Sequence, residues 1–258
     1  GLRVYGLSKS SLKQIVVRVP PLKEQEAIAE ALIDSDAAIE ALDALIAKKR
    51  NVKQATMQQL LTGRTRLPGF IEGWKDVNLG EIARMRSGGT PPTSVSAYYG
   101  GDTPWASISD MSSSGKYLSR TERTLTDEGL ANSAAVVFPA GVLLYAMYAS
   151  IGECCVSQRP MATSQAILGI ECTAKVDVEY LYYVMQYLRP AIAQSGQQGT
   201  QSNLNAQMVR DTVIPLPTLQ EQHAIAAVLS GMDAEIEALV AQRDKLRLVK
   251  QGMMQELL

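Results

Sequence analysis

The sequence predicts an α+β protein: one mixed α/β domain flanked by two long helices that pair as an antiparallel coiled coil. Residues 21–63 and 218–258 place apolar side chains at alternating steps of three and four, the spacing of helices that pack along a seam. Between these segments Gly, Ser, Thr, Tyr and Gln become frequent, and helical periodicity mostly disappears. With 258 residues, 46% of them hydrophobic and 20% charged, the chain can bury a core, so a disordered chain is excluded.

The two helical segments are copies of one another. Residues 7–61 align without gaps to residues 204–258 at an offset of 197, with 26 identities in 55 positions. A period this long does not fit a solenoid, whose repeats span about 20 to 45 residues. The repeat therefore predicts a unit that consists of a variable domain followed by a helix. Because Leu7 aligns with Leu204, near the end of the second unit, the chain contains one full unit and the end of a preceding one.

Each copy begins with a short predicted strand, residues 15–19 and 212–216, which ends at proline. A helix follows, with Glu24 or Glu221 in its first turn, where the helix dipole favours negative charge. Gly63 and Pro68 end the first helix in a basic linker.

The apolar positions of the seam identify the side chains expected to pair the helices. They are Ile39, Leu42, Ile46, Leu60, Ile236, Leu239, Leu246, Met253 and Leu257. Lys49, Lys53, Arg243 and Lys250 also fall on the seam, and charged residues at such positions commonly set register or partner choice. The alternative interpretation is two ordinary amphipathic surface helices.

The variable region, residues 70–203, reads as an α+β module. Residues 134–138, 142–148 and 166–171 are predicted strands, and residues 178–188 are a predicted helix. Two long loops are expected, at residues 86–101 and 196–203.

The sequence offers little for catalysis, cofactors or metals. The one histidine, His223, lies at a helix start, and the chain contains neither a Walker-type phosphate loop nor the Asn-Pro-Pro-aromatic tetrad of adenine methyltransferases. Cys154, Cys155 and Cys172 fit neither a disulfide framework nor a spaced zinc site and are expected to be reduced packing residues. We therefore predict no catalytic, cofactor-binding or metal residues. No apolar run reaches the roughly 20 residues of a membrane helix, so a cytoplasmic location without membrane contact is expected.

An ordered set of motifs resembles the opening of a target recognition domain from the specificity (S) subunit of Type I restriction-modification systems. The motifs are GWKDVNLGEI at residues 73–82, SGGTP at 87–91 and YGGDTPW at 99–105. Residues 138–141, 150–152, 164–166 and 199–204 are also similar, and the Glu-Gln helix starts are similar to the conserved spacer regions of that family. The resemblance covers nearly the whole chain.

The resemblance implies a non-catalytic subunit that reads one half of a split DNA target. Residues 64–217 are then the target recognition domain, residues 21–63 and 218–258 are the first and second spacer helices, and residues 1–20 are the remnant tail of a preceding recognition domain. Implied partners are double-stranded DNA, DNA adenine methyltransferase (modification) subunits docked on the alanine-rich helices, and a restriction/translocase subunit. The missing body of the first domain departs from the family pattern. Either the chain is a fragment, or it is a natural half-subunit that pairs as a homodimer.

Polar side chains that can bond base edges lie on the two predicted loops, and two arginines lie near the first loop. The DNA-binding candidates are Arg84, Arg86, Thr90, Thr93, Ser94, Gln197, Gln198, Thr200, Gln201 and Asn203. Lys116, Arg120 and Arg123 follow the first loop. Alternatively, these side chains are simply solvated, or Arg84 and Arg86 pair with Glu81 or Asp102.

The net charge of the variable region does not indicate DNA binding. Residues 71–203 hold 9 Lys plus Arg and 12 Asp plus Glu, a balance of 9 − 12 = −3. Nonspecific attraction to phosphates is therefore weak, and tight binding is expected to need partner subunits. The competing hypothesis is a structural coiled-coil dimerisation protein without DNA readout.

Overall fold

The computed structural model describes residues 11–257, except residues 12, 15, 17–18 and 197–203. The chain forms two compact units: unit 1 comprises Gly1–Asn51 and Asp233–Leu258, and unit 2 comprises Val52–Met232. Two helices, α2 (Leu22–Leu60) and α8 (Leu219–Leu257), each contribute residues to both units. No helix among the described residues is both long and apolar enough to cross a membrane.

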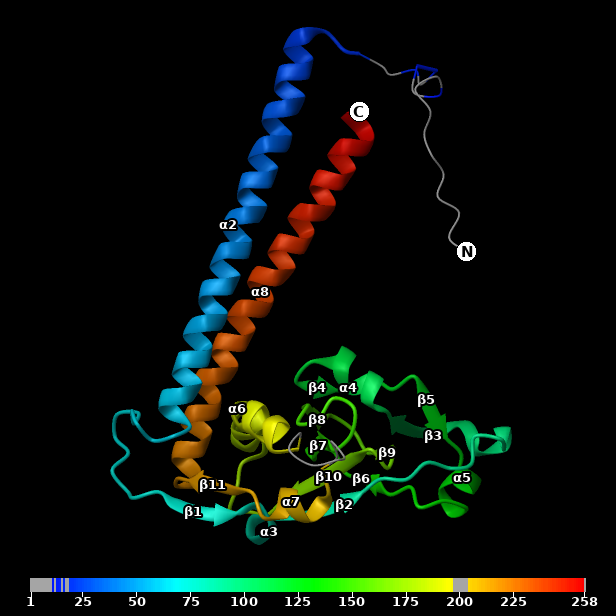
Figure 1. Ribbon diagram of the computed structural model, residues 1–258, viewed down its shortest axis with the longest axis vertical. Helices are drawn as coiled ribbons and strands as arrows, with labels where there is room; N and C mark the ends of the chain where they lie inside the picture. The colour runs from blue at the N-terminus through cyan, green and yellow to red at the C-terminus, as the bar shows by residue number, and fades with distance from the viewer. Residues whose placement is uncertain (1–10, 12, 15, 17–18, 197–203, 258) are drawn as a thin grey trace. The chain divides into compact units, whose positions relative to one another are not determined.

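In unit 1, α2 and α8 lie side by side and antiparallel (Figure 1). Ion pairs fix the direction: Lys49 meets Glu235 at 2.5 Å, Asp43 meets Arg243 at 3.1 Å, and Asp36 meets Lys250. As the residue number falls along α2, the number of the partner rises along α8. The predicted antiparallel pairing is therefore confirmed.

Helix α2 begins directly after Pro21 and α8 begins two residues after Pro217, and each carries an acidic residue in its first turn, Glu24 and Glu221. Proline has no backbone N–H to donate to a strand ladder, but it is tolerated at the start of a helix. It therefore marks the point where the strand ends and the helix begins. At the other end of α2, Gly63 adopts a φ of +67°, a left-handed conformation that glycine adopts at little cost and that ends helices.

Unit 2 is built on two mixed sheets. The five-stranded sheet has the order β2 (Ala83–Ser87), β10 (Ile167–Cys172), β7 (Leu143–Ala146), β8 (Cys154–Ser157), β4 (Tyr117–Leu118). The four-stranded sheet has the order β5 (Arg123–Leu125), β3 (Tyr99–Ala106), β9 (Met161–Thr163), β6 (Val137–Phe138).

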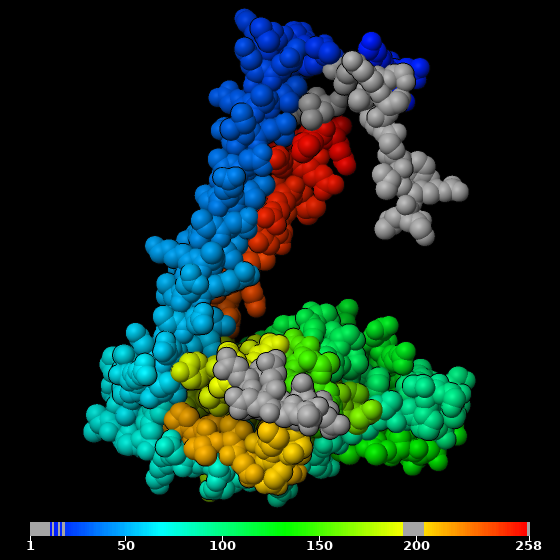
Figure 2. Space-filling model, viewed as in Figure 1, coloured from blue at the N-terminus to red at the C-terminus, as the bar shows by residue number. Residues whose placement is uncertain are grey.

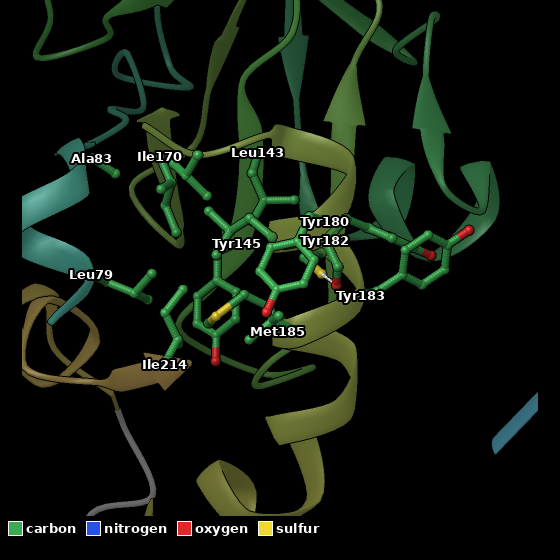
Figure 3. Packing of buried hydrophobic residues seen from close by; sticks show 14 of the residues in the cluster. Leu79, Ala83, Leu143, Tyr145, Ile170, Tyr180, Tyr182, Tyr183, Met185 and Ile214 are labelled. Atoms are coloured by element: carbon green, nitrogen blue, oxygen red, sulfur yellow. Dashed lines mark hydrogen bonds between the residues drawn. The ribbon is translucent and has the colours of Figure 1, made fainter. Parts of the chain in front are cut away.

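Alternation along β7 divides the core of unit 2 into two layers. Leu143 and Tyr145 enter a cluster with α6 (Val178–Gly196), whereas Leu144 enters a second cluster with Phe138 of the four-stranded sheet. Figure 3 shows the first cluster, in which Tyr145 and Met185 pack together. Since successive side chains of a strand point to opposite faces, the five-stranded sheet is the middle layer, and its inner strands β7 and β8 are buried on both faces.

A two-stranded sheet brings together two strands from the beginning and the end of unit 2. β1 (Lys75–Asn78) pairs antiparallel with β11 (Val213–Leu216), with Lys75 opposite Leu216. Short helices complete unit 2: α3 (Leu79–Ile82), η1 (Ser96–Tyr98), α4 (Ile108–Ser114), α5 (Asp127–Ala131) and α7 (Ala206–Arg210).

Most predicted elements of this region are present with shifted bounds. The predicted strand 134–138 is confirmed only at β6, and α6 continues beyond the predicted end at residue 188, through Pro190. The predicted loop 86–101 is too long, because its ends belong to β2 and β3 and η1 lies within it. Most of the loop 196–203 and much of the strand 15–19 lie outside the described residues.

Candidate nucleic-acid interface

The glycines of the SGGTP motif hold a surface loop, residues 88–98, against the sheets. The Gly88 and Gly89 amides donate to the carbonyls of Ile167 and Thr163, at 3.0 and 2.9 Å. A Cβ on Gly89 would lie only 2.5 Å from the Ala134 carbonyl oxygen. No larger side chain fits at this contact, so the motif's glycines serve the backbone packing of the loop.

Two aromatic residues of β3 fix the same loop. The Trp105 indole N–H donates to the Gly89 carbonyl at 2.9 Å, and the Tyr99 hydroxyl donates to the Pro91 carbonyl at 2.7 Å. The two rings meet edge to face with centroids 6.3 Å apart. Trp105 is buried, as expected for a core residue, while Tyr99 forms the rim of the loop.

Strands β3 and β5 border two adjacent hollows. Together we call them the β3–β5 hollow. The larger has a volume of about 620 Å³ and is lined by Thr93, Tyr99, Gly100, Glu122, Arg123 and Thr124. The smaller, about 260 Å³, is lined by Trp105, Ser107, Ser109, Asp110, Glu122 and Arg123. β3, β5 and α5 form the green end of unit 2 on the right of Figures 1 and 2. The lining offers hydroxyls, a guanidinium and carboxylates, the groups that bond base edges.

The charged side chains of this hollow differ in whether they are already bonded within the protein. Asp110 is committed to the fold: its carboxylate accepts from the backbone N–H of Ser107 and of Glu122, both at 2.8 Å, and closes the capping box of α4. Arg123 is exposed, its guanidinium lies 5.8 Å from the centre of the Tyr99 ring, and it forms no ion pair within the described part of the chain.

The predicted DNA-binding residues are divided between two places. Thr93 lines the hollow and Ser94 is exposed beside it in the chain, whereas Thr90 hydrogen-bonds the side chain of Gln165. Arg84 and Arg86 lie exposed on β2, the edge strand of the other sheet. Gln197, Gln198, Thr200, Gln201 and Asn203 lie outside the described residues.

Arg86 is already occupied by contacts within the protein. Its guanidinium forms an ion pair with Glu171 of the adjacent strand at 2.7 Å and stacks over the Phe138 ring at 5.4 Å. The partner is neither Glu81 nor Asp102, because the register places the β10 carboxylate beside β2.

Lys116 is not part of a surface basic cluster. Its side chain is only 9% exposed, its ammonium lies 4.6 Å from the centre of the Tyr183 ring, and it donates to the Ser230 hydroxyl at 2.9 Å. Glu179 supplies the counter-charge. The expectation from chain position is corrected because tyrosines on α6 enclose this lysine, so it cannot reach a phosphate.

A buried polar contact that the sequence did not reveal lies at the start of α8. Glu221 is fully buried and accepts from Arg66 at 2.5 and 2.7 Å and from the Trp74 indole at 3.0 Å. The hydrogen bond to this carboxylate raises the pKa of Arg66. Gln222, also buried, donates to the Pro217 carbonyl at 2.9 Å and accepts from the Asp177 N–H.

The first copy of this helix start makes the same local bond without the buried contact. Gln25 donates to the Pro20 carbonyl at 2.7 Å, the counterpart of the Gln222 bond at the offset of 197. Glu24, the counterpart of Glu221, is exposed. The duplicated motif thus encodes the helix start in both copies, and among the described residues an arginine and a tryptophan bond the glutamate of the second copy alone.

The predicted helix-pairing residues are placed as follows. Ile46 and Ile236 are buried in unit 1, where Ile39, Leu42, Leu239, Leu246 and Met253 are half-buried. Leu60 is buried in unit 2, and the side chain of Leu257 lies outside the described part.

The histidine and the three cysteines lie as follows. His223 is exposed, with Nε2 3.4 Å from the Asp177 carboxylate, so the two pair only when the histidine is protonated. All three cysteines are free, and burial raises the pKa of Cys155 and of Cys172 to about 12. Among the described residues, no three His, Cys, Asp or Glu side chains gather as metal ligands.

Comparisons with known proteins agree with the motif resemblance. The family model of the Type I restriction modification DNA specificity domain matches residues 71–246. The Type I restriction enzyme MjaIX specificity subunit of Methanocaldococcus jannaschii is 31% identical over 180 residues, which cover 67% of this chain and 41% of that protein.

Two solved structures share the fold. The HsdS subunit from Thermoanaerobacter tengcongensis aligns with a TM-score of 0.58 at 20% identity, over 100% of this chain and 63% of that one. A chain from a structural study of complex assembly and conformational transition of the type I R-M system aligns at 0.65 and 21% identity, over 93% and 60%. The chain thus spans less than two thirds of the length of these relatives. Because the family model matches most of the chain, including the whole sheet domain, the chain belongs to the Type I restriction modification DNA specificity domain family.

Proposed function

We propose that the chain is a non-catalytic DNA-recognition subunit of a Type I restriction-modification complex and reads one half of a split target. The observation that carries this proposal is the β3–β5 hollow, a polar, arginine-bearing recess on paired strands inside the segment that matches the family. Strands hold side chains more rigidly than loops do, and rigid placement is what base discrimination requires.

Methylation and cleavage then reside in partner subunits. The acidic balance of residues 71–203 disfavours tight binding by this chain alone, because phosphate neutralisation supplies much of the affinity for DNA. We propose that adenine methyltransferase subunits dock on the spacer helices and enclose the DNA, and that a restriction/translocase subunit joins the full complex. The complex is expected in the cytoplasm, where its DNA is.

The first spacer copy is proposed to seat another recognition domain. Its Glu24 matches Glu221 in a segment of high identity, but Glu24 is exposed while Glu221 holds Arg66 and Trp74. A domain that starts with an equivalent arginine and tryptophan would complete the first copy. It would be the body of a preceding domain in the same chain. A homodimer is the alternative, in which two half-subunits supply two recognition domains.

The test is DNA selection by the chain assembled with the modification subunits of its own operon. A randomised duplex library, selected by binding and read by sequencing, is expected to yield a split motif, and methylation should map to the same motif. The isolated chain should bind the selected duplex far more weakly at physiological salt. An assembled complex with no sequence preference would favour the structural coiled-coil alternative.

A further inference from the structure

We propose that Arg123 is a specificity-determining residue that reads a guanine in the major groove from the β3–β5 hollow. This inference rests on the proposed function and names the side chain through which it operates. Arg123 lies on β5, outside the loops in which polar base-reading residues were expected.

Strand pairing fixes the backbone of Arg123. Arg123 lies opposite Trp105, whose indole is bonded to the Gly89 carbonyl. Next to this pair the register shifts between Tyr99 and Thr103, and Gly100 adopts a φ of +86°. Gly101 packs on the backbone of β5's end, where a Cβ would lie 2.5 Å from the Cα of Thr126. Irregularities of this kind bend a strand locally, while the pairs at Pro104 and Trp105 keep β3 joined to β5.

The guanidinium is oriented by an aromatic ring. It lies 5.8 Å from the centre of the Tyr99 ring, and Tyr99 is itself held by its hydroxyl bond to Pro91. An arginine supported on an aromatic face loses less freedom when it binds, and its planar fork matches the O6 and N7 acceptors of guanine.

Contacts elsewhere in the protein occupy three other arginines of unit 2. Arg66 is bonded to Glu221, Arg86 to Glu171, and Arg210 donates to the Met85 carbonyl at 3.2 Å. The guanidinium of Arg123 has no carboxylate partner among the described residues, although the hollow contains carboxylates. Its hydrogen-bond donors therefore remain available.

The carboxylates favour a base edge over a phosphate. Glu122 lines both hollows beside Arg123, and its negative charge repels the DNA backbone. A carboxylate can instead accept from the N4 amine of cytosine. Arg123 and Glu122 together thus match the two edges of one G·C pair.

The experiment uses the complex assembled with its modification subunits, first on a randomised duplex library. The selected duplex is then remade with each base pair changed in turn. Arg123→Ala should reduce discrimination at one G·C position by about 10- to 100-fold and leave the other positions unchanged. Arg123→Lys should lose the same discrimination, because an ammonium lacks the planar fork. Arg120→Ala, an exposed arginine that does not line the hollow, is the matched control and should retain the wild-type profile.

Several results would overturn the inference. Equal loss of affinity for every sequence, or full rescue by lysine, would make Arg123 a phosphate contact. An unchanged base profile in Arg123→Ala would exclude it as a reader. Since Arg123 is exposed, its variants should fold. Glu122→Gln provides an independent check, because it should reduce discrimination at the same G·C base pair. Wild-type complex without any base preference would refute the proposed function itself, whereas a wild-type preference retained by the variants refutes only this inference.

Discussion

The contact between Gly169 and Phe138 gives a sharp test of how the two sheets pack. Gly169 lies in the middle of β10, and Phe138, on β6 of the other sheet, is fully buried. A Cβ added to Gly169 would lie 2.5 Å from Cζ and 2.6 Å from Cδ1 of the Phe138 ring. Gly169→Ala must therefore displace the ring or the strand.

The magnitudes follow from the two opposing effects. Overpacking a closed core costs about 1 to 3 kcal/mol, so Gly169→Ala should lower the free energy of unfolding by that amount. Phe138→Ala removes the ring and should cost about 3 to 5 kcal/mol. In that background alanine at 169 meets no ring and should stabilise by about 0.5 to 1 kcal/mol, because glycine weakens a strand interior. The coupling between the sites is then about 1.5 to 4 kcal/mol.

Urea unfolding followed by tryptophan fluorescence measures this cycle, because Trp74 and Trp105 both belong to unit 2. Gly73→Ala is the control, since a Cβ there meets nothing within 4 Å. If Gly169→Ala destabilises both backgrounds equally, the ring is not what excludes the methyl group, and the account of the sheet interface is wrong.

Three further predictions concern buried groups. Tyr145→Phe should leave stability unchanged or raise it by about 1 kcal/mol in thermal unfolding, because the buried hydroxyl has no partner among the described residues; a clear loss would contradict this. Burial raises the pKa of Cys155 and Cys172 to about 12, above the unfolded value near 8.5. The unfolded thiols therefore lose their protons first as the pH rises. The stabilising contribution of the two folded thiols is complete below about pH 8.5 and is lost between about pH 8.5 and pH 12. A thiol reagent at pH 8 should accordingly modify all three cysteines in urea but not in the folded protein. Glu221→Gln should lower the melting temperature and Glu24→Gln should not; equal effects would refute the distinction between the two copies.

The sequence predicted best what depends on local spacing. The long helices, their starts after proline and their antiparallel seam follow from a periodicity of 3.6 and from helix-capping chemistry, which operate within a few residues. Strands β7 and β10 were found because both are short apolar runs. Strand β3 was missed, because Gly100, Gly101 and Pro104 are typical of loops and only pairing with β5 and β9 makes them a strand.

The candidate site was harder to predict for a related reason. Polarity and position on a loop selected Thr90 and Arg86, but both side chains are bonded within the protein, to Gln165 and Glu171. Those partners are 75 and 85 residues away along the chain, and no local pattern indicates them. Arg123 was noticed only as one basic residue among several, because its place in the hollow beside the Tyr99 ring depends on the pairing of β3 with β5.

The duplicated helix start shows, within one molecule, what local sequence determines and what distant residues determine. Glu24 and Glu221 occupy matching positions, and the neighbouring glutamines make the same bond to a proline carbonyl in both copies. Local sequence therefore determines the helix start equally well in each. Burial differs completely, because Arg66 and Trp74 reach Glu221 from positions 155 and 147 residues distant. Glu221 is a buried anchor because Arg66 and Trp74 supply its donors. The motif alone therefore predicts the helix start, whereas the burial of its glutamate depends on residues far away in the chain.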